Sequence, residues 1–103
     1  MNNIRELLSS DREQFLNLLT HLTKVEPLTQ EEFDSILLYN NNYSKTFVLV
    51  ENEKLLGTVK IAIDRKFARK GGKLAFFEDF VVLPEARGKG LGSLLIKYAS
   101  EFA

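Results

Sequence analysis

The 103-residue sequence predicts one α/β domain with a mixed, mainly antiparallel sheet flanked by helices. Three observations lead to this fold class. Two capping boxes of the pattern S/T-x-x-E each precede apolar residues at helical spacing, and three segments rich in β-branched and aromatic residues then follow. A glycine-rich turn separates the last of these segments from an amphipathic stretch. We assign residues 1–103 to this single domain, because a chain of this length holds one hydrophobic core.

The N-terminal part is predicted to contain a short strand and two helices. Residues 4–8 favour the strand. The first box, at 10–13, opens a helix that should run to about residue 23, because its apolar residues recur at three- and four-residue steps. The second box, at 29–32, opens a helix that should end at the asparagine run 40–42.

The remaining residues predict three strands and a third helix. Strands are expected at 46–50, 55–67 and 74–83, joined by tight turns. The continuous apolar character of 74–83 favours a central strand, which Pro84 ends. One face of the following helix is expected to carry Leu91, Leu94, Leu95, Tyr98 and Phe102.

Composition and charge argue against several classes of function. Fourteen basic and fourteen acidic residues cancel, so no overall field attracts nucleic acid or an anionic membrane. The chain has no cysteine and a single histidine, His21, which argues against disulfides, a thiolate nucleophile and a metal site. We expect a cytoplasmic protein without metal, nucleic acid or membrane partners.

The turn from Arg87 to Gly92 has the composition of an anion site. It lies between a strand and a helix, where free N–H groups and the helix dipole favour phosphate, and its glycines let the backbone approach closely. Neither the P-loop pattern nor the dinucleotide pattern G-x-G-x-x-G fits, since the last position of the latter would be Ser93. The pattern that fits is R-x-x-G-x-G; an ordinary surface turn is the alternative.

In its context this turn resembles the coenzyme A pyrophosphate motif of the GNAT superfamily of acetyltransferases. Residues 77–82, with the sequence FEDFVV, precede it as in the glucosamine-6-phosphate N-acetyltransferase branch, and residues 22–33 and 63–67 are similar to that branch as well. The resemblance implies the acyl-CoA N-acyltransferase fold and transfer of acetyl from acetyl-CoA, without a metal, to the amine of glucosamine 6-phosphate. It also implies a homodimer.

The resemblance assigns residues to two sites. The backbone of Phe80, Val81 and Val82 would follow the pantetheine arm, and the pyrophosphate would bind to Arg87, Gly88, Lys89, Gly90, Leu91, Gly92 and Ser93. The sugar phosphate would bind to Thr23, Lys66, Phe67, Ala68, Arg69, Glu78 and Asp79.

Glu78 and Asp79 are the candidate catalytic residues. Because neighbours on a regular strand point to opposite faces, only one of them is expected to enter a given pocket. Glu78 would orient the acceptor amine or remove its proton through water; a structural ion pair is the alternative. Six basic residues nearby are explained mainly by a solvated hairpin: Lys60, Arg65, Lys66, Arg69, Lys70 and Lys73.

Members of the superfamily continue beyond the helix with further strands and a helix, so the resemblance implies that this C-terminal part of the fold is missing from the 103 residues. That part supplies the acid for the leaving thiolate. Three alternatives therefore stay open: a non-catalytic acyl-CoA binding or sensing module, a GNAT enzyme acting on another amine, and a structural or pairing unit.

Overall fold

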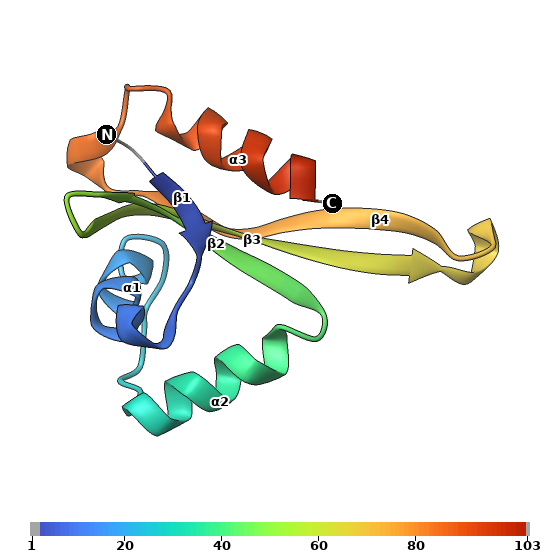
Figure 1. The fold of residues 1–103 in the computed structure, drawn as a ribbon, viewed down its shortest axis with the longest axis horizontal. Coiled ribbons are helices and arrows are strands. Elements are labelled where there is room, and N and C mark those ends of the chain that lie inside the picture. Colours follow the sequence, from blue (N-terminus) through green and yellow to red (C-terminus); the bar gives the residue numbers. More distant parts are fainter. Residues whose placement is uncertain (1–2, 103) are drawn as a thin grey trace.

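A computed structural model describes residues 3–102 of the chain, which form a sheet with helices on both faces (Figure 1). The strands are β1 (Asn3–Glu6), β2 (Ser44–Glu51), β3 (Lys54–Lys66) and β4 (Gly72–Val82), and the helices are α1 (Arg12–Leu19), α2 (Gln30–Asn40) and α3 (Leu91–Phe102). The strand order is β1-β2-β3-β4, and each of these pairs is antiparallel. The predicted α/β class and element order are confirmed. A parallel partner for β4 would need a strand after α3, because only a helical crossover returns the chain in the same direction.

The two capping boxes have different outcomes. At α2 the predicted box forms: the Glu32 N–H donates to Thr29 Oγ1 (3.1 Å), and the Thr29 N–H donates to Glu32 Oε1 (2.8 Å). The box predicted at 10–13 is wrong. A short 3₁₀ turn, Ser9–Asp11, precedes α1, and the group that accepts the Leu8 N–H is the carboxylate of Asp11.

α3 covers one face of the sheet, and α1 and α2 cover the other (Figure 1). Phe47 of β2 packs against the rings of Tyr98 and Phe102 on the α3 face, at centroid separations of 5.1 and 5.3 Å. Phe15 and Phe33 meet edge to face on the other side. The predicted apolar face of α3 is only partly correct. Leu91, Leu95 and Ala99 are buried at four-residue steps, whereas Leu94, Tyr98 and Phe102 are about half exposed.

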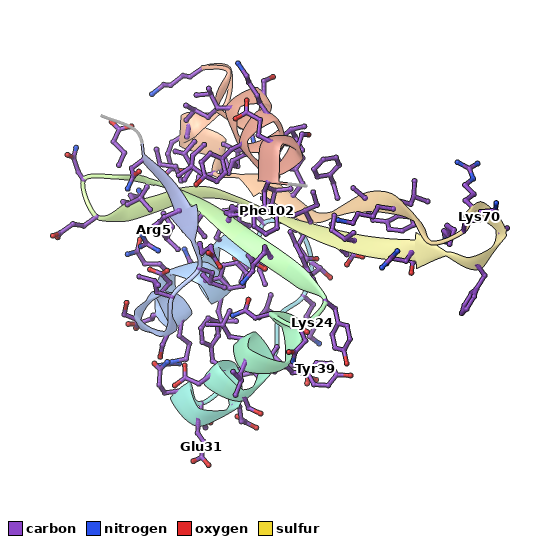
Figure 2. The ribbon with its side chains drawn as sticks, turned by 45° about the vertical axis from the view of Figure 1, so that its right-hand side comes forward. Arg5, Lys24, Glu31, Tyr39, Lys70 and Phe102 are labelled. Atoms are coloured by element: carbon purple, nitrogen blue, oxygen red, sulfur yellow. The ribbon has the colours of Figure 1, made fainter. Side chains whose placement is uncertain are left out.

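The β3–β4 hairpin extends well beyond the helices (Figure 1). Its end is a short 3₁₀ turn, Phe67–Arg69, followed by Lys70 and Gly71 in the left-handed region. Figure 2 shows Lys70 at the far end, away from the helices. The prediction that β4 is central is wrong for the described sheet, where β4 is an edge strand. Its apolar run therefore leaves Leu74, Phe76 and Phe77 substantially exposed.

An ion pair between a partly exposed arginine and a buried aspartate joins β1 to the start of α1. Arg5 donates two hydrogen bonds to the carboxylate of Asp11, at 2.8 and 3.0 Å, and the Asp11 residue is 6% exposed. Burial by itself raises the pKa of Asp11, but the hydrogen bonds from Arg5 and the Leu8 N–H, with the charge of Arg5, bring the pKa below its ordinary value. The pair thus fixes where α1 begins.

We predict that Asp11→Asn destabilises the chain at neutral pH by about 2 kcal/mol, because hydrogen bonds to a charged partner are lost. A carboxyl whose pKa is lowered on folding stabilises the fold above its ordinary value of 3.8 and loses that contribution as the pH falls through the folded value. Urea unfolding at pH 7 and at successively lower pH should therefore show the gap between wild type and variant closing. A gap that is independent of pH would contradict this role.

Candidate functional site

The turn before α3 forms an open cradle. Gly88 and Gly90 have φ values of +83° and +74°, in the left-handed region that favours glycine, and a Cβ built on either would meet nothing within 4 Å. The cradle leads directly into α3, where the first N–H groups of a twelve-residue helix are available. A polyphosphate can therefore approach this backbone without meeting a side chain.

A cavity of about 600 Å³ lies between the end of β4 and the first turns of α3. Its walls come from both elements and from the cradle: Phe80, Val82, Ala86, Arg87, Gly88, Gly90, Leu91, Gly92, Ser93, Ile96 and Lys97. The structure therefore brings together most of the residues that the sequence predicted for the cofactor. Lys89 is an exception, because it lines a separate hollow with Glu51 and Glu85.

Arg87 is anchored on the strand. Its Nε donates to the carbonyl oxygen of Val82 at 2.9 Å, and its terminal nitrogens make no hydrogen bond or ion pair within residues 3–102. The Leu83 N–H donates to Leu56 of β3. Since successive N–H groups on a strand point to opposite edges, the N–H of Val82 points to the outer edge of β4. The guanidinium of Arg87 and the outward amide of Val82 thus share one border of the cavity.

The ring of Phe80 lies on Gly92. A Cβ built on Gly92 would be 2.9 Å from Phe80 Cζ, closer than real Cβ atoms approach a neighbour. Phe80 is nevertheless 42% exposed, since its other face borders the cavity. The missing side chain at Gly92 is thus what lets this ring pack against α3.

A β-bulge interrupts β4 beside this cavity. Thr58 of β3 pairs with Val81 and Lys60 pairs with Glu78, so Val59 faces both Asp79 and Phe80. Asp79 has φ +50°, a conformation that non-glycine residues rarely adopt outside turns and bulges. The extra residue breaks the alternation of side chains on β4.

The bulge places both carboxylates on the face of α1 and α2. Glu78 Oε2 lies 4.0 Å from the Nζ of Lys60, its cross-strand partner, and Lys60 and Asp79 line one cavity together. The expectation that Glu78 and Asp79 point to opposite faces is therefore wrong, although only Asp79 of the two lines this cavity. Phe80 and Val82 then lie on the α3 face, so the same strand borders two hollows on opposite sides.

The second cavity, of about 170 Å³, is mostly apolar. Its polar groups come from Asn40, Thr46, Lys60 and Asp79, and the rest of its wall consists of apolar side chains of α1 and α2 together with Leu7 and Leu28. The sequence pattern assigns no separate role to Lys60, because a solvated hairpin explains this cluster of basic residues. Only the register of β3 on β4, which places Lys60 opposite Glu78, could have identified it.

The other predicted substrate residues are spread along the hairpin. Lys66 forms an ion pair with Asp64 (2.9 Å), which lowers the pKa of that carboxyl, and its Nζ lies 5.6 Å from the ring centroid of Phe76. Phe67, Ala68 and Arg69 form the exposed turn at the end. Lys66 lies six residues along β3 from Lys60, so their Cα atoms are about 20 Å apart at the usual rise per residue.

Thr23 is not brought to this site by any described contact. It lies just after α1, is exposed, and donates its N–H to the carbonyl of Leu19.

Within residues 3–102 no helix has the length and apolar character needed to cross a membrane, and no three His, Asp or Glu side chains gather as a metal site would require.

Comparison with known proteins gives one consistent result. The model of the acetyltransferase (GNAT) family matches residues 2–103. The chain is 37% identical to glucosamine 6-phosphate N-acetyltransferase of Arabidopsis thaliana, over 92% of this chain and 68% of that protein. It is 35% identical to the Trypanosoma brucei brucei protein of the same name, over 90% of this chain and 65% of the relative. The chain thus spans about two thirds of these relatives.

The fold agrees with solved structures. A crystal structure of a Trypanosoma brucei acetyltransferase superposes with a TM-score of 0.93 at 33% identity, covering 99% of this chain and 74% of that one. The crystal structure of the Arabidopsis thaliana glucosamine-6-phosphate N-acetyltransferase gives 0.88 at 32% identity, covering 98% of this chain and 73% of that one.

We predict that Gly92→Ala and Phe80→Ala are coupled by about 1 kcal/mol. In the Phe80→Ala background the alanine should be tolerated because the ring is gone, whereas in the wild type the alanine must displace the ring of Phe80 at a cost of about 1 kcal/mol. Urea unfolding of the four chains measures the coupling. Gly88→Ala is the control, because a Cβ at that position meets no neighbour, and its change in unfolding free energy should add to that of Phe80→Ala. If the changes for Gly92→Ala and Phe80→Ala also add, the packing of the ring on Gly92 is contradicted.

Proposed function

The chain belongs to the acetyltransferase (GNAT) family, and on that premise we propose that it is an N-acetyltransferase that transfers acetyl from acetyl-CoA to the amine of glucosamine 6-phosphate. The observation that carries the proposal is the bulge in β4. It sets the cradle cavity on one face and two carboxylates on the other, with only the strand between them. A donor and an acceptor can therefore meet at one edge.

The cradle fits the coenzyme A part of the donor. Gly88 and Gly90 leave their backbone accessible, and Arg87 offers terminal nitrogens to a phosphate. The outward amide of Val82, and by alternation that of Phe80, are placed to pair with an extended chain such as the pantetheine arm. Acetyl-CoA supplies an activated acyl group when bound; the protein supplies its orientation.

Glu78 is the residue that we propose for the acceptor amine. It is half exposed and lies beside the bulge, so it can accept a proton from an incoming ammonium directly or through water. Asp79 lies on the same face and adds a second negative charge that attracts an ammonium. Because the chain has no cysteine, we propose direct transfer to the amine without an acyl-enzyme.

The phosphate of the acceptor would bind Lys66 in the same chain. The Lys66 ammonium lies over Phe76, two residues from Glu78 along β4, whereas Arg69 lies beyond the end of both strands. Nitrogen and phosphorus of glucosamine 6-phosphate are less than about 10 Å apart. Arg69 is therefore too distant to serve the same acceptor, and we propose that Phe67, Ala68 and Arg69 reach the site of a second copy in a homodimer.

The apolar second cavity favours one alternative. Its walls of leucine and phenylalanine next to Asp79 suit an amine with an apolar body better than a sugar, so a GNAT enzyme acting on another amine is the second candidate. A non-catalytic acyl-CoA binding module would keep the cradle and lose the acceptor chemistry.

For each of these candidate functions we propose the cytoplasm as the compartment, in keeping with a chain that has no cysteine to oxidise.

We predict that the chain binds acetyl-CoA, measured by isothermal titration, and that Arg87→Ala weakens binding about tenfold by removing a charge-assisted contact. Gly90→Asp should abolish binding, because it adds strain and negative charge in the cradle. Lys73→Ala removes an exposed cation from the far part of β4 and should leave the affinity unchanged. Circular dichroism checks that each variant is folded, and no binding by the wild type would remove the donor from the proposal.

We predict that free thiol is released faster with glucosamine 6-phosphate than with glucosamine. Lys66→Met should raise the KM for the phosphorylated sugar about tenfold, since it removes one charged contact, and leave the KM for glucosamine unchanged. Faster release with glucosamine or with an apolar amine would show that the acceptor is wrongly assigned. Donor binding without release for any amine would favour the binding module.

A further inference from the structure

We propose that Lys60 is a self-acetylation site, at which the chain transfers the acetyl group of bound acetyl-CoA to its own side chain. The inference rests on the proposed donor binding but not on the identity of the acceptor. Its ground is that the amine which the structure places beside Glu78 belongs to the protein itself: Lys60 Nζ lies 4.0 Å from Glu78 Oε2.

The surroundings of Lys60 differ from those of the other lysines in described ion pairs. Its side chain is 20% exposed, against 28% for Lys45, 41% for Lys66 and 56% for Lys54. Lys54 pairs with Glu85 and Lys66 with Asp64, neither of which lies in the bulge. Lys60 alone among these pairs with Glu78, and it also lines the cavity that contains Asp79.

The reach of the side chain suits the transfer. Lys60 and Glu78 are register partners on adjacent strands, which lie about 4.8 Å apart. An extended lysine places its nitrogen roughly 6 Å from its Cα, far enough to cross the backbone of β4 at the bulge.

The reaction balances without any other reactant. The Lys60 ammonium gives one proton to Glu78, directly or through water, and the nitrogen lone pair attacks the thioester carbonyl carbon. A carbon–nitrogen bond forms, the carbon–sulfur bond breaks with its electron pair on sulfur, and the second nitrogen proton passes to that sulfur. The products are acetyl-Lys60 and coenzyme A. The modified side chain is neutral, so the ion pair with Glu78 is lost.

The test incubates the full chain with acetyl-CoA and follows acetylation of each lysine by peptide mass spectrometry. Lys60 should react at least about tenfold faster than Lys45, a half-buried lysine paired with Glu6 away from the bulge, because Lys60, unlike Lys45, lies beside the bulge and Glu78. Glu78→Gln should slow the reaction of Lys60 about a hundredfold by removing the base. Lys60→Arg keeps the positive charge and should show no acetylation at position 60.

A second measurement does not depend on turnover. Bound coenzyme A, which carries no acyl group, should protect Lys60 several-fold from an amine-reactive N-hydroxysuccinimide ester and leave Lys45 unprotected. Acetyl-CoA that binds in the titration without favouring Lys60, or coenzyme A that binds without protecting it, would overturn the inference and leave the proposed donor site intact. Failure of acetyl-CoA to bind would overturn both, whereas selective acetylation of Lys60 in Gly90→Asp would overturn the role of the cradle.

Discussion

One extra residue in β4 determines which side chains of this strand face each of the two candidate sites. Without the bulge at Asp79, strict alternation would place Glu78 and Phe80 on one face and Asp79 on the other. With it, both carboxylates lie toward α1 and α2, and Phe80 lies toward α3. The cost is an aspartate at φ +50°, which the register of β3 on both sides of the bulge maintains.

The cradle depends on a second fit, between β4 and α3. The ring of Phe80 occupies the space that a side chain at Gly92 would need. The position of α3 therefore depends on the position of this ring. Gly57 of β3 also allows close packing, because a Cβ at this position would lie 3.0 Å from Leu95 Cδ1 and 3.1 Å from the Val81 carbonyl oxygen. These two glycines let α3 approach the strands closely, and the cradle follows from where α3 begins.

The sequence predicted what local patterns determine and missed what register determines. The box at 29–32, the hairpins and the turn at 87–92 each depend on neighbouring residues, and all are present. The bulge at Asp79 has only a weak sequence signal, because glycine marks a left-handed position clearly, whereas aspartate adopts that conformation only occasionally. Lys60 was overlooked for the same reason. Its partner lies on another strand, and a shift of one residue would have turned it to the opposite face.

The two sites share β4 but require different residues. This difference explains how an enzyme and a non-catalytic binding module could be related. The cradle requires glycine backbone and Arg87, whereas the acceptor face requires the bulge and the side chains beside it. Substitution on one face can therefore remove acceptor chemistry while donor binding persists, so an enzyme and a binding module differ by few residues. The Lys60 ammonium lies next to Glu78, so the protein carries an amine of its own at the place where we propose that the acceptor amine binds. The free acceptor must then displace Lys60 from Glu78, and acetylation of Lys60 would remove that competitor by neutralising it.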